Sequence, residues 1–147
     1  MIVYLDSSVI VRALLPDEPD HLRSRELLDD PMSIRITGSW SIVEITAAIT
    51  RAVRAFRGDE EAMFASFRNE VDPRFGSVTV VDAVQAEVEA IATAIVRRTG
   101  IRSLDAWHLA CAQLAFDDLA EPGETRGFAT RDDKQAEAAE SLGFTLV

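Results

Sequence analysis

Near the start of the chain, Ile2-Val3-Tyr4-Leu5 is followed directly by Asp6-Ser7-Ser8 and then by the apolar segment 9–15. The first four residues have the composition of a β-strand. The segment that follows predicts a short helix that ends near Pro16, because proline cannot continue a helix. A strand that leads straight into a helix is typical of α/β proteins.

The rest of the chain repeats this alternation of short strands and longer helices. Strands are expected at 34–37, 78–81, 127–130 and 144–147, and helices at 20–28, 41–56, 60–71, 82–99, 103–119 and 133–142. Asp82 is expected to cap the long helix that ends at Gly100. Because parallel strands need crossover helices on both faces, we predict an α/β fold with a central, mainly parallel sheet, in one domain over residues 1–147, with 41–71 as a helical hairpin.

Composition excludes several classes of protein. The chain has 147 residues, 15 Lys and Arg against 25 Asp and Glu, and a net charge of −10. One cysteine, Cys111, gives no disulfide framework and no cysteine zinc site, and the two histidines are too few for a typical zinc enzyme. No apolar run is long enough to span a bilayer, and the N-terminus lacks a signal peptide, so a cytoplasmic protein is expected. The acidity argues against broad, nonspecific binding of nucleic acid, although carboxylates can be the catalytic groups of a nuclease.

Four acidic residues, Asp6, Glu44, Asp105 and Asp132, lie close to the starts of predicted helices. Each has a purely structural explanation. Asp6 and Asp132 can cap or flank a helix start, Ser41-x-x-Glu44 has the form of a capping box, and Asp105 would follow an N-cap at Ser103, where a negative charge suits the helix dipole.

Taken together, the four acids favour a shared site. In a parallel α/β sheet, the strand ends that lead into helices point the same way, and ligands bind outside these carboxyl ends. Several carboxylates in one partly buried place repel one another unless a cation lies between them. Their hard oxygen atoms favour Mg²⁺ or Mn²⁺, and a pair of such ions can promote hydrolysis of a phosphodiester.

Four segments around these acids resemble the four acidic blocks of the PIN domain, most closely those of VapC-type toxin ribonucleases from bacterial toxin–antitoxin modules. The segments are Leu5-Asp6-Ser7-Ser8, Ser41-Ile42-Val43-Glu44-Ile45, Leu104-Asp105-Ala106-Trp107-His108-Leu109-Ala110 and Ala129-Thr130-Arg131-Asp132. The resemblance covers nearly the whole chain. It implies a three-layer α/β/α sandwich, a Mg²⁺- or Mn²⁺-dependent endoribonuclease that cleaves RNA, a VapB-like antitoxin as partner, and a homodimer.

The same resemblance implies roles for individual residues. Asp6, Glu44, Asp105 and Asp132 would be the catalytic, metal-binding acids. Ser8 and Thr130 would support them by hydrogen bonds. The Thr-x-Asp spacing favours Asp132 over Asp133 as the acid that faces the site. Trp107 stands where a smaller apolar residue is more usual.

Three other residues are candidates for contact with RNA. Arg51 and Arg54 fall on one helical face after Glu44, although a solvated helix end explains them equally well. His108 lies on the same helical side as Asp105 and could touch substrate, or it could be a buried structural histidine.

Two other functions compete with the nuclease. One is a PIN-like module that binds RNA or protein without cutting. The other is a phosphotransferase or phosphatase with Asp6 as nucleophile. Enzymes of the haloacid-dehalogenase type carry a second acid two residues after the nucleophile, and Ser8 at that position disfavours this function.

Overall fold

Five parallel strands form one sheet in the order β3-β2-β1-β4-β5. A computed structural model describes all residues from 1 to 147. The strands are β1 (Ile2–Leu5), β2 (Ile34–Gly38), β3 (Thr79–Val81), β4 (Arg126–Ala129) and β5 (Thr145–Leu146). The predicted parallel sheet is therefore confirmed, with the first strand of the chain at its centre.

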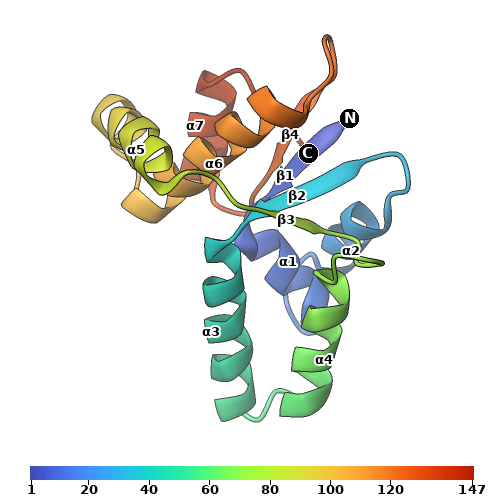
Figure 1. Ribbon diagram of the computed structural model, residues 1–147. Helices are drawn as coiled ribbons and strands as arrows, with labels where there is room; N and C mark the ends of the chain where they lie inside the picture. The colour runs from blue at the N-terminus through green and yellow to red at the C-terminus, as the bar shows by residue number, and fades with distance from the viewer.

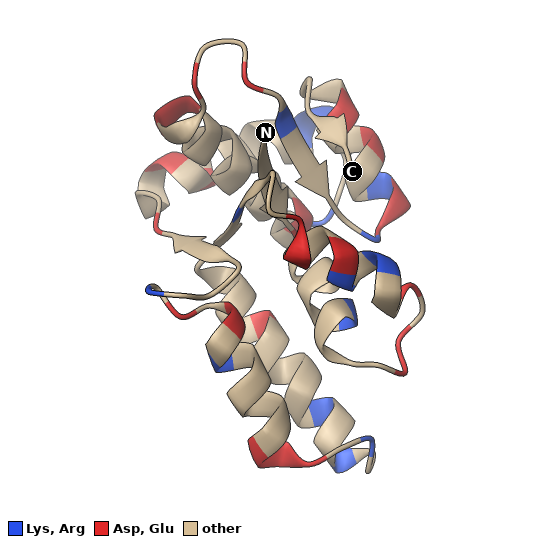
Figure 2. Ribbon diagram, turned by 90° about the vertical axis from the view of Figure 1, so that its right-hand side faces the viewer, with Lys and Arg blue, Asp and Glu red and all other residues tan.

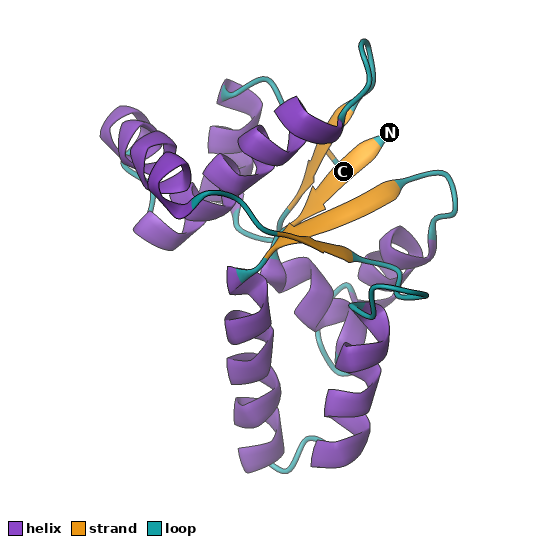
Figure 3. Cartoon of the chain, viewed as in Figure 1, coloured by secondary structure: helices purple, strands orange, loops and turns teal.

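Helices cover both faces of this sheet (Figure 1). One layer contains α1 (Ser7–Leu14), α2 (His21–Asp29), α3 (Trp40–Arg54) and α4 (Glu60–Glu70), and the other contains α5 (Gln85–Thr99), α6 (Ser103–Leu119) and α7 (Asp133–Ser141). Figure 3 shows the sheet between these two groups of helices. The three-layer α/β/α sandwich that the resemblance implied is confirmed. None of the helices combines the length and hydrophobicity needed to cross a membrane.

Strand β1 supplies both halves of the hydrophobic core. Its side chains alternate, because successive residues of a strand point to opposite faces. Val3 and Leu5 pack with the α1–α4 layer, whereas Ile2 and Tyr4 pack with the α5–α7 layer. All four residues are buried, which explains why this strand is apolar throughout instead of alternating with polar residues.

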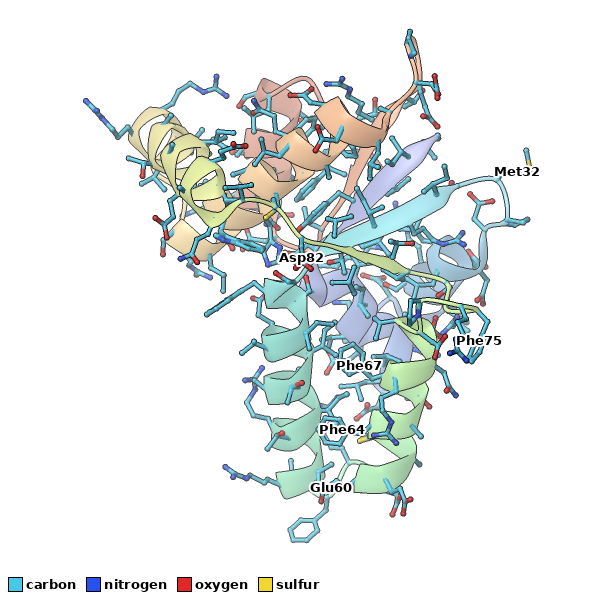
Figure 4. All side chains as sticks on the ribbon, viewed as in Figure 1. Met32, Glu60, Phe64, Phe67, Phe75 and Asp82 are labelled. Atoms are coloured by element: carbon cyan, nitrogen blue, oxygen red, sulfur yellow. The ribbon has the colours of Figure 1, made fainter.

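Helices α3 and α4 form the predicted hairpin, which extends beyond the sheet (Figure 1). Figure 4 shows Phe64 and Phe67 on α4 turned inward, toward the space between the two helices, whereas Phe75 and Met32 lie at the surface. Phe67 is buried in the same cluster as Ile45 of α3. The hairpin is therefore anchored to the sheet through its apolar inner face, which leaves the start of α3 fixed at the carboxyl end of β2.

The expected cap at Asp82 is wrong. Helix α5 begins at Gln85, and Val84 occupies the N-cap position without a side-chain hydrogen bond. Residues 82–84 instead carry the chain from edge strand β3 to the opposite layer before the helix begins. Cys111 is buried in the core, and burial raises the pKa of its thiol to about 12.

Gly38, at the end of β2, lies where a side chain does not fit. A Cβ atom at this position would lie 2.7 Å from the Tyr4 hydroxyl oxygen and 2.8 Å from Cζ3 of Trp107. We expect Gly38→Ala to lower the free energy of unfolding by about 1–3 kcal/mol, because the buried ring of Tyr4 and the half-buried ring of Trp107 must shift. Urea unfolding measures this loss. Gly58→Ala is the control, because there the nearest atom is the flexible end of Met63; equal losses in both variants would contradict the prediction.

Candidate active site

The four predicted acids come from elements that meet at the carboxyl edge of the sheet. Asp6 directly follows β1, and Asp132 follows β4, its neighbour in the sheet. Glu44 lies near the start of α3, which follows β2, and Asp105 lies in the first turn of α6. Because β1, β2 and β4 are adjacent and parallel, these positions converge on one edge, as the sequence predicted.

Asp6 is both a helix cap and part of this cluster. It is the N-cap of α1, and its Oδ2 accepts a hydrogen bond of 2.9 Å from the backbone N–H of Ser8. Its Oδ1 accepts a bond of 3.3 Å from the side-chain amide of Gln135. Only 7% of the residue is exposed. Capping and membership of the site are therefore not alternatives here, because each uses a different carboxylate oxygen.

Asp132 combines the same two features. It is the N-cap of α7, and its Oδ1 accepts a hydrogen bond of 2.9 Å from the backbone N–H of Gln135. The hydroxyl of Thr130 accepts a bond of 3.1 Å from the backbone N–H of Asp132. The hydroxyl of Ser8 accepts a bond of 3.2 Å from the backbone N–H of Arg131. Ser8 and Thr130 thus hold the loop that presents Asp132.

Glu44 does not belong to a capping box, so that structural explanation is wrong. Helix α3 begins at Trp40, ahead of Ser41. The hydroxyl of Ser41 is buried and hydrogen-bonds instead to that of Thr37, at 2.7 Å. Oε2 of Glu44 lies 2.6 Å from Nε2 of His108. The early start of the helix leaves the carboxylate available to the cluster.

The pKa of Asp105 is raised, in part by the other acids close to it. Burial raises the pKa of its carboxyl group, and the charges of Asp132 and Asp6 raise it further, against a smaller opposing effect of Arg102. The expected N-cap at Ser103 is off by one position, since α6 begins at Ser103 and Arg102 is its N-cap residue. Asp132 is thus the acid whose charge acts on Asp105, whereas Asp133 is exposed.

His108 is buried between two elements of the site and is not exposed to substrate. Only 1% of the residue is accessible. Its Nδ1 lies 2.9 Å from the Tyr4 hydroxyl, and its Nε2 lies 3.7 Å from Oδ1 of Asp6, in addition to its contact with Glu44. His108 is therefore a buried structural histidine, as one of the two interpretations held. The groups that it contacts belong to the acid cluster.

Sequence reasoning missed Gln135 and Tyr4. Gln135 is 1% exposed, and its side-chain amide donates to Asp6 and, at 3.4 Å, to the backbone carbonyl of Asp105. Its carbonyl oxygen accepts a 2.5 Å bond from Thr130. A glutamine three residues after an aspartate at a helix start is a capping-box pattern, and that signal at Asp132-x-x-Gln135 could have found it. Tyr4 has a weaker signal, as the one hydroxyl in an apolar strand.

A cleft of about 400 Å³ adjoins the cluster and contains charges of both signs. Its charged lining residues are Asp105, Asp132, Asp133, Arg102, Arg131 and Lys134. Arg51 and Arg54, the predicted RNA contacts, lie in the last turn of α3, and about ten residues of helix separate Glu44 from Arg54, roughly 15 Å. Figure 2 shows basic residues at the end of the hairpin that lies away from the sheet. The structure does not bring Arg51 and Arg54 to the acids.

The donor chemistry of the cluster fits a hard divalent cation. Its ionisable groups are chiefly carboxylates, and after burial the charges of Asp132 and Asp6 raise the pKa of Asp105 further. Carboxylate oxygens are the ligands of Mg²⁺ and Mn²⁺. As they stand, no three His, Cys, Asp or Glu side chains are arranged to enclose a metal ion.

Comparison with known proteins adds independent findings. The family model of the PIN domain matches residues 3–141. A crystal structure of VapBC2 from Rickettsia felis, bound to a promoter DNA fragment, is similar with a TM-score of 0.63 and 13% identity over 100% of this chain and 98% of that one. VapC20 from Mycobacterium tuberculosis, described as a sarcin-ricin loop cleaving toxin, has a TM-score of 0.64 and 16% identity over 97% and 96%. FitAcB from Neisseria gonorrhoeae has a TM-score of 0.58 and 20% identity over 99% and 96%. No relative was found among curated protein sequences.

Proposed function

Because this chain belongs to the PIN domain family, we propose that it is a metal-dependent endoribonuclease that hydrolyses RNA phosphodiester bonds and acts as the toxin of a toxin–antitoxin pair. The observation that carries the proposal is the convergence of Asp6, Asp105 and Asp132, where burial and then the charges of Asp132 and Asp6 raise the pKa of Asp105. Such crowding is unfavourable in the free protein and is typical of a site that works with a bound cation.

Each acid has a distinct place in the proposed site. Asp6 and Asp105 would hold Mg²⁺ or Mn²⁺, with Glu44 and Asp132 completing the set directly or through water. The bound ion would supply charge neutralisation at the phosphate and a more acidic water for hydrolysis. Gln135 keeps Asp6 and the start of α6 in register through its two donated hydrogen bonds. Ser8 and Thr130 fix the loop that carries Asp132.

The net charge of −10 determines how RNA must be held. An acidic protein repels RNA over most of its surface, so binding must be local. We propose that Arg102 and Lys134, which line the cleft with two of the acids, contact phosphates beside the scissile bond. Arg51 and Arg54 remain candidates for contact with a more distant part of the RNA.

The toxin role is supported by the solved structures that share the fold, which include VapBC and other toxin–antitoxin complexes. We propose a VapB-like antitoxin as partner, a homodimer as the assembly, and the cytoplasm as the place of action. A growth assay tests this role. Expression in a bacterium should arrest growth, and co-expression of the antitoxin encoded next to the gene should relieve the arrest. Growth equal to that of the empty vector would contradict it.

Nuclease activity is tested on one labelled RNA and the DNA of the same sequence. With Mg²⁺ or Mn²⁺ we expect endonucleolytic cleavage of the RNA, no cleavage of the DNA, and no cleavage of either when EDTA is present. If no RNA is cut with either ion, the catalytic proposal fails. RNA binding without cutting would then favour the alternative, a non-catalytic PIN-like module that binds RNA or protein.

A further inference from the structure

A continuous chain of hydrogen bonds runs from the sheet into the acid cluster. The backbone N–H of Gly38 donates to the Tyr4 hydroxyl oxygen at 2.9 Å. The same hydroxyl lies 2.9 Å from Nδ1 of His108, and Nε2 of His108 lies 2.6 Å from Oε2 of Glu44. Tyr4 and His108 are both at most 1% exposed, so water does not compete for these bonds.

The direction of each bond follows from what each group can donate. The Glu44 carboxylate only accepts, so Nε2 of His108 carries the proton between them. The Tyr4 oxygen already accepts from Gly38, and its own O–H finds an acceptor in Nδ1. This assignment satisfies every donor in the chain, with Nε2 of His108 as the donor to Glu44 and Nδ1 as the acceptor from Tyr4.

We propose that His108 is a positioning residue for Glu44. Its Nε2–H holds Oε2, and the Tyr4 hydroxyl fixes the orientation of the imidazole ring, so that Glu44 offers its other oxygen to the cation or the substrate. This inference rests on the proposed nuclease function. It replaces the earlier hypothesis that His108 touches RNA, and it adds Tyr4, which neither the motifs nor the comparisons assign.

The packing around the ring restricts it further. Trp107 meets His108 edge-to-face, with ring centroids 5.4 Å apart and planes at 89°. Tyr4 stacks on Phe128 at 5.5 Å with planes 2° apart, which fixes the hydroxyl in place. A ring held on both sides cannot turn its Nε2 away from Glu44 without disturbing the core. Hydrogen bonds that orient a ligating group from behind typically change activity or metal affinity about 10- to 100-fold when removed.

The first test needs no activity. Long-range ¹H–¹⁵N NMR of the metal-free protein should show His108 protonated on Nε2 with an unprotonated Nδ1. His21 is the internal reference, because its Nδ1 lies 2.7 Å from the carbonyl oxygen of Arg12 and must be protonated. Glu44→Gln should move the Nε2–H proton signal of His108 upfield, whereas the exposed control Glu87→Gln should leave it unchanged. An unprotonated Nε2, or a signal that Glu44→Gln does not move, would overturn the proposal.

The second test uses kinetics in variants shown to be folded by circular dichroism. His108→Leu should lower kcat about 10- to 100-fold with little change in KM, and His108→Gln, which keeps an N–H donor, should restore part of kcat. Tyr4→Phe should give a smaller loss of kcat. A folded His108→Leu protein with wild-type kcat, or a His108→Gln protein no better than His108→Leu, would overturn the proposal. A wild-type protein without nuclease activity would refute the proposed function, and the NMR result would still decide the contact.

Discussion

Asp105→Asn is expected to abolish RNA cleavage while leaving the protein folded, and Asp6→Asn is expected to do the same. Each substitution removes a carboxylate that we propose as a metal ligand and keeps the size of the side chain. We expect kcat/KM to fall by roughly 10²–10³-fold or more, as when a group that stabilises developing charge is lost. Rates of cleavage of one labelled RNA measure this. Asp118→Asn is the matched control, since Asp118 is an exposed acid on the same helix.

Asp105→Asn should also stabilise the metal-free protein. The pKa of Asp105 is higher in the folded protein than in the unfolded chain, where it is about 3.9. The free energy of unfolding therefore falls as the pH rises from the pKa of the unfolded chain through the pKa of the folded protein. At pH 7 the charge is therefore unfavourable. Asp105→Asn should raise Tm by about 1–3 °C at pH 7 and by nothing below about pH 3. A variant that is both inactive and less stable than wild type would indicate misfolding and would not support the account.

Phe128→Ala is expected to give the largest loss of stability. Phe128 is fully buried in β4, next to Tyr4 in the register of the sheet, and its ring stacks on Tyr4 and, at 6.1 Å, on Phe144. Removing it leaves a cavity that rigid neighbours cannot fill. The free energy of unfolding should fall by about 3–5 kcal/mol.

Urea unfolding followed by circular dichroism measures this loss. Phe75→Ala is the control, because Phe75 is 75% exposed and its removal should change stability by less than about 0.5 kcal/mol. A loss under about 1 kcal/mol for Phe128→Ala would mean that the ring is not part of a packed core. Since Phe128 supports Tyr4, the loss of packing should also reduce the activity of the folded fraction.

Local patterns in the sequence were sufficient to predict the strands, the helices and the parallel sheet. Ile2 to Leu5 are apolar on both faces, which is typical of a central parallel strand, and β1 is indeed at the centre of the sheet. The start of helix α5 was less predictable. Asp82 has the chemistry of a cap, but the position of the next helix depends on the distance the chain must cover to the other layer, which no local pattern encodes.

Some features of the candidate site could likewise be predicted from the sequence, and others could not. Proximity of the acids to helix starts follows from motif spacing and from the common direction of parallel strands. The partners of those acids do not, because Gln135 lies 129 residues from Asp6 and His108 lies 64 residues from Glu44. Whether Glu44 is a cap or a site residue was undecided in the sequence. The start of α3 at Trp40 rules out the capping box, because the Ser41 hydroxyl then hydrogen-bonds to Thr37, and the role of Glu44 in the site stays a prediction.

The structure also shows where the excess acidic residues lie. Most acids lie at the surface and oppose RNA, whereas Asp6, Glu44, Asp105 and Asp132 meet at one edge of the sheet. The cleft beside them contains arginine and lysine as well. A bound divalent cation would offset much of the negative charge at that edge only, which is consistent with a nuclease that engages RNA at one place.

The most direct test of the central claim is the binding of Mn²⁺ to the purified protein, measured by isothermal titration calorimetry without RNA. We expect the wild-type protein and Asp118→Asn to bind Mn²⁺ with equal affinity and Asp105→Asn to bind it at least about tenfold more weakly. Equal Mn²⁺ affinity in Asp105→Asn and the wild type, or no binding by the wild type at millimolar Mn²⁺, would contradict a metal site built from these acids.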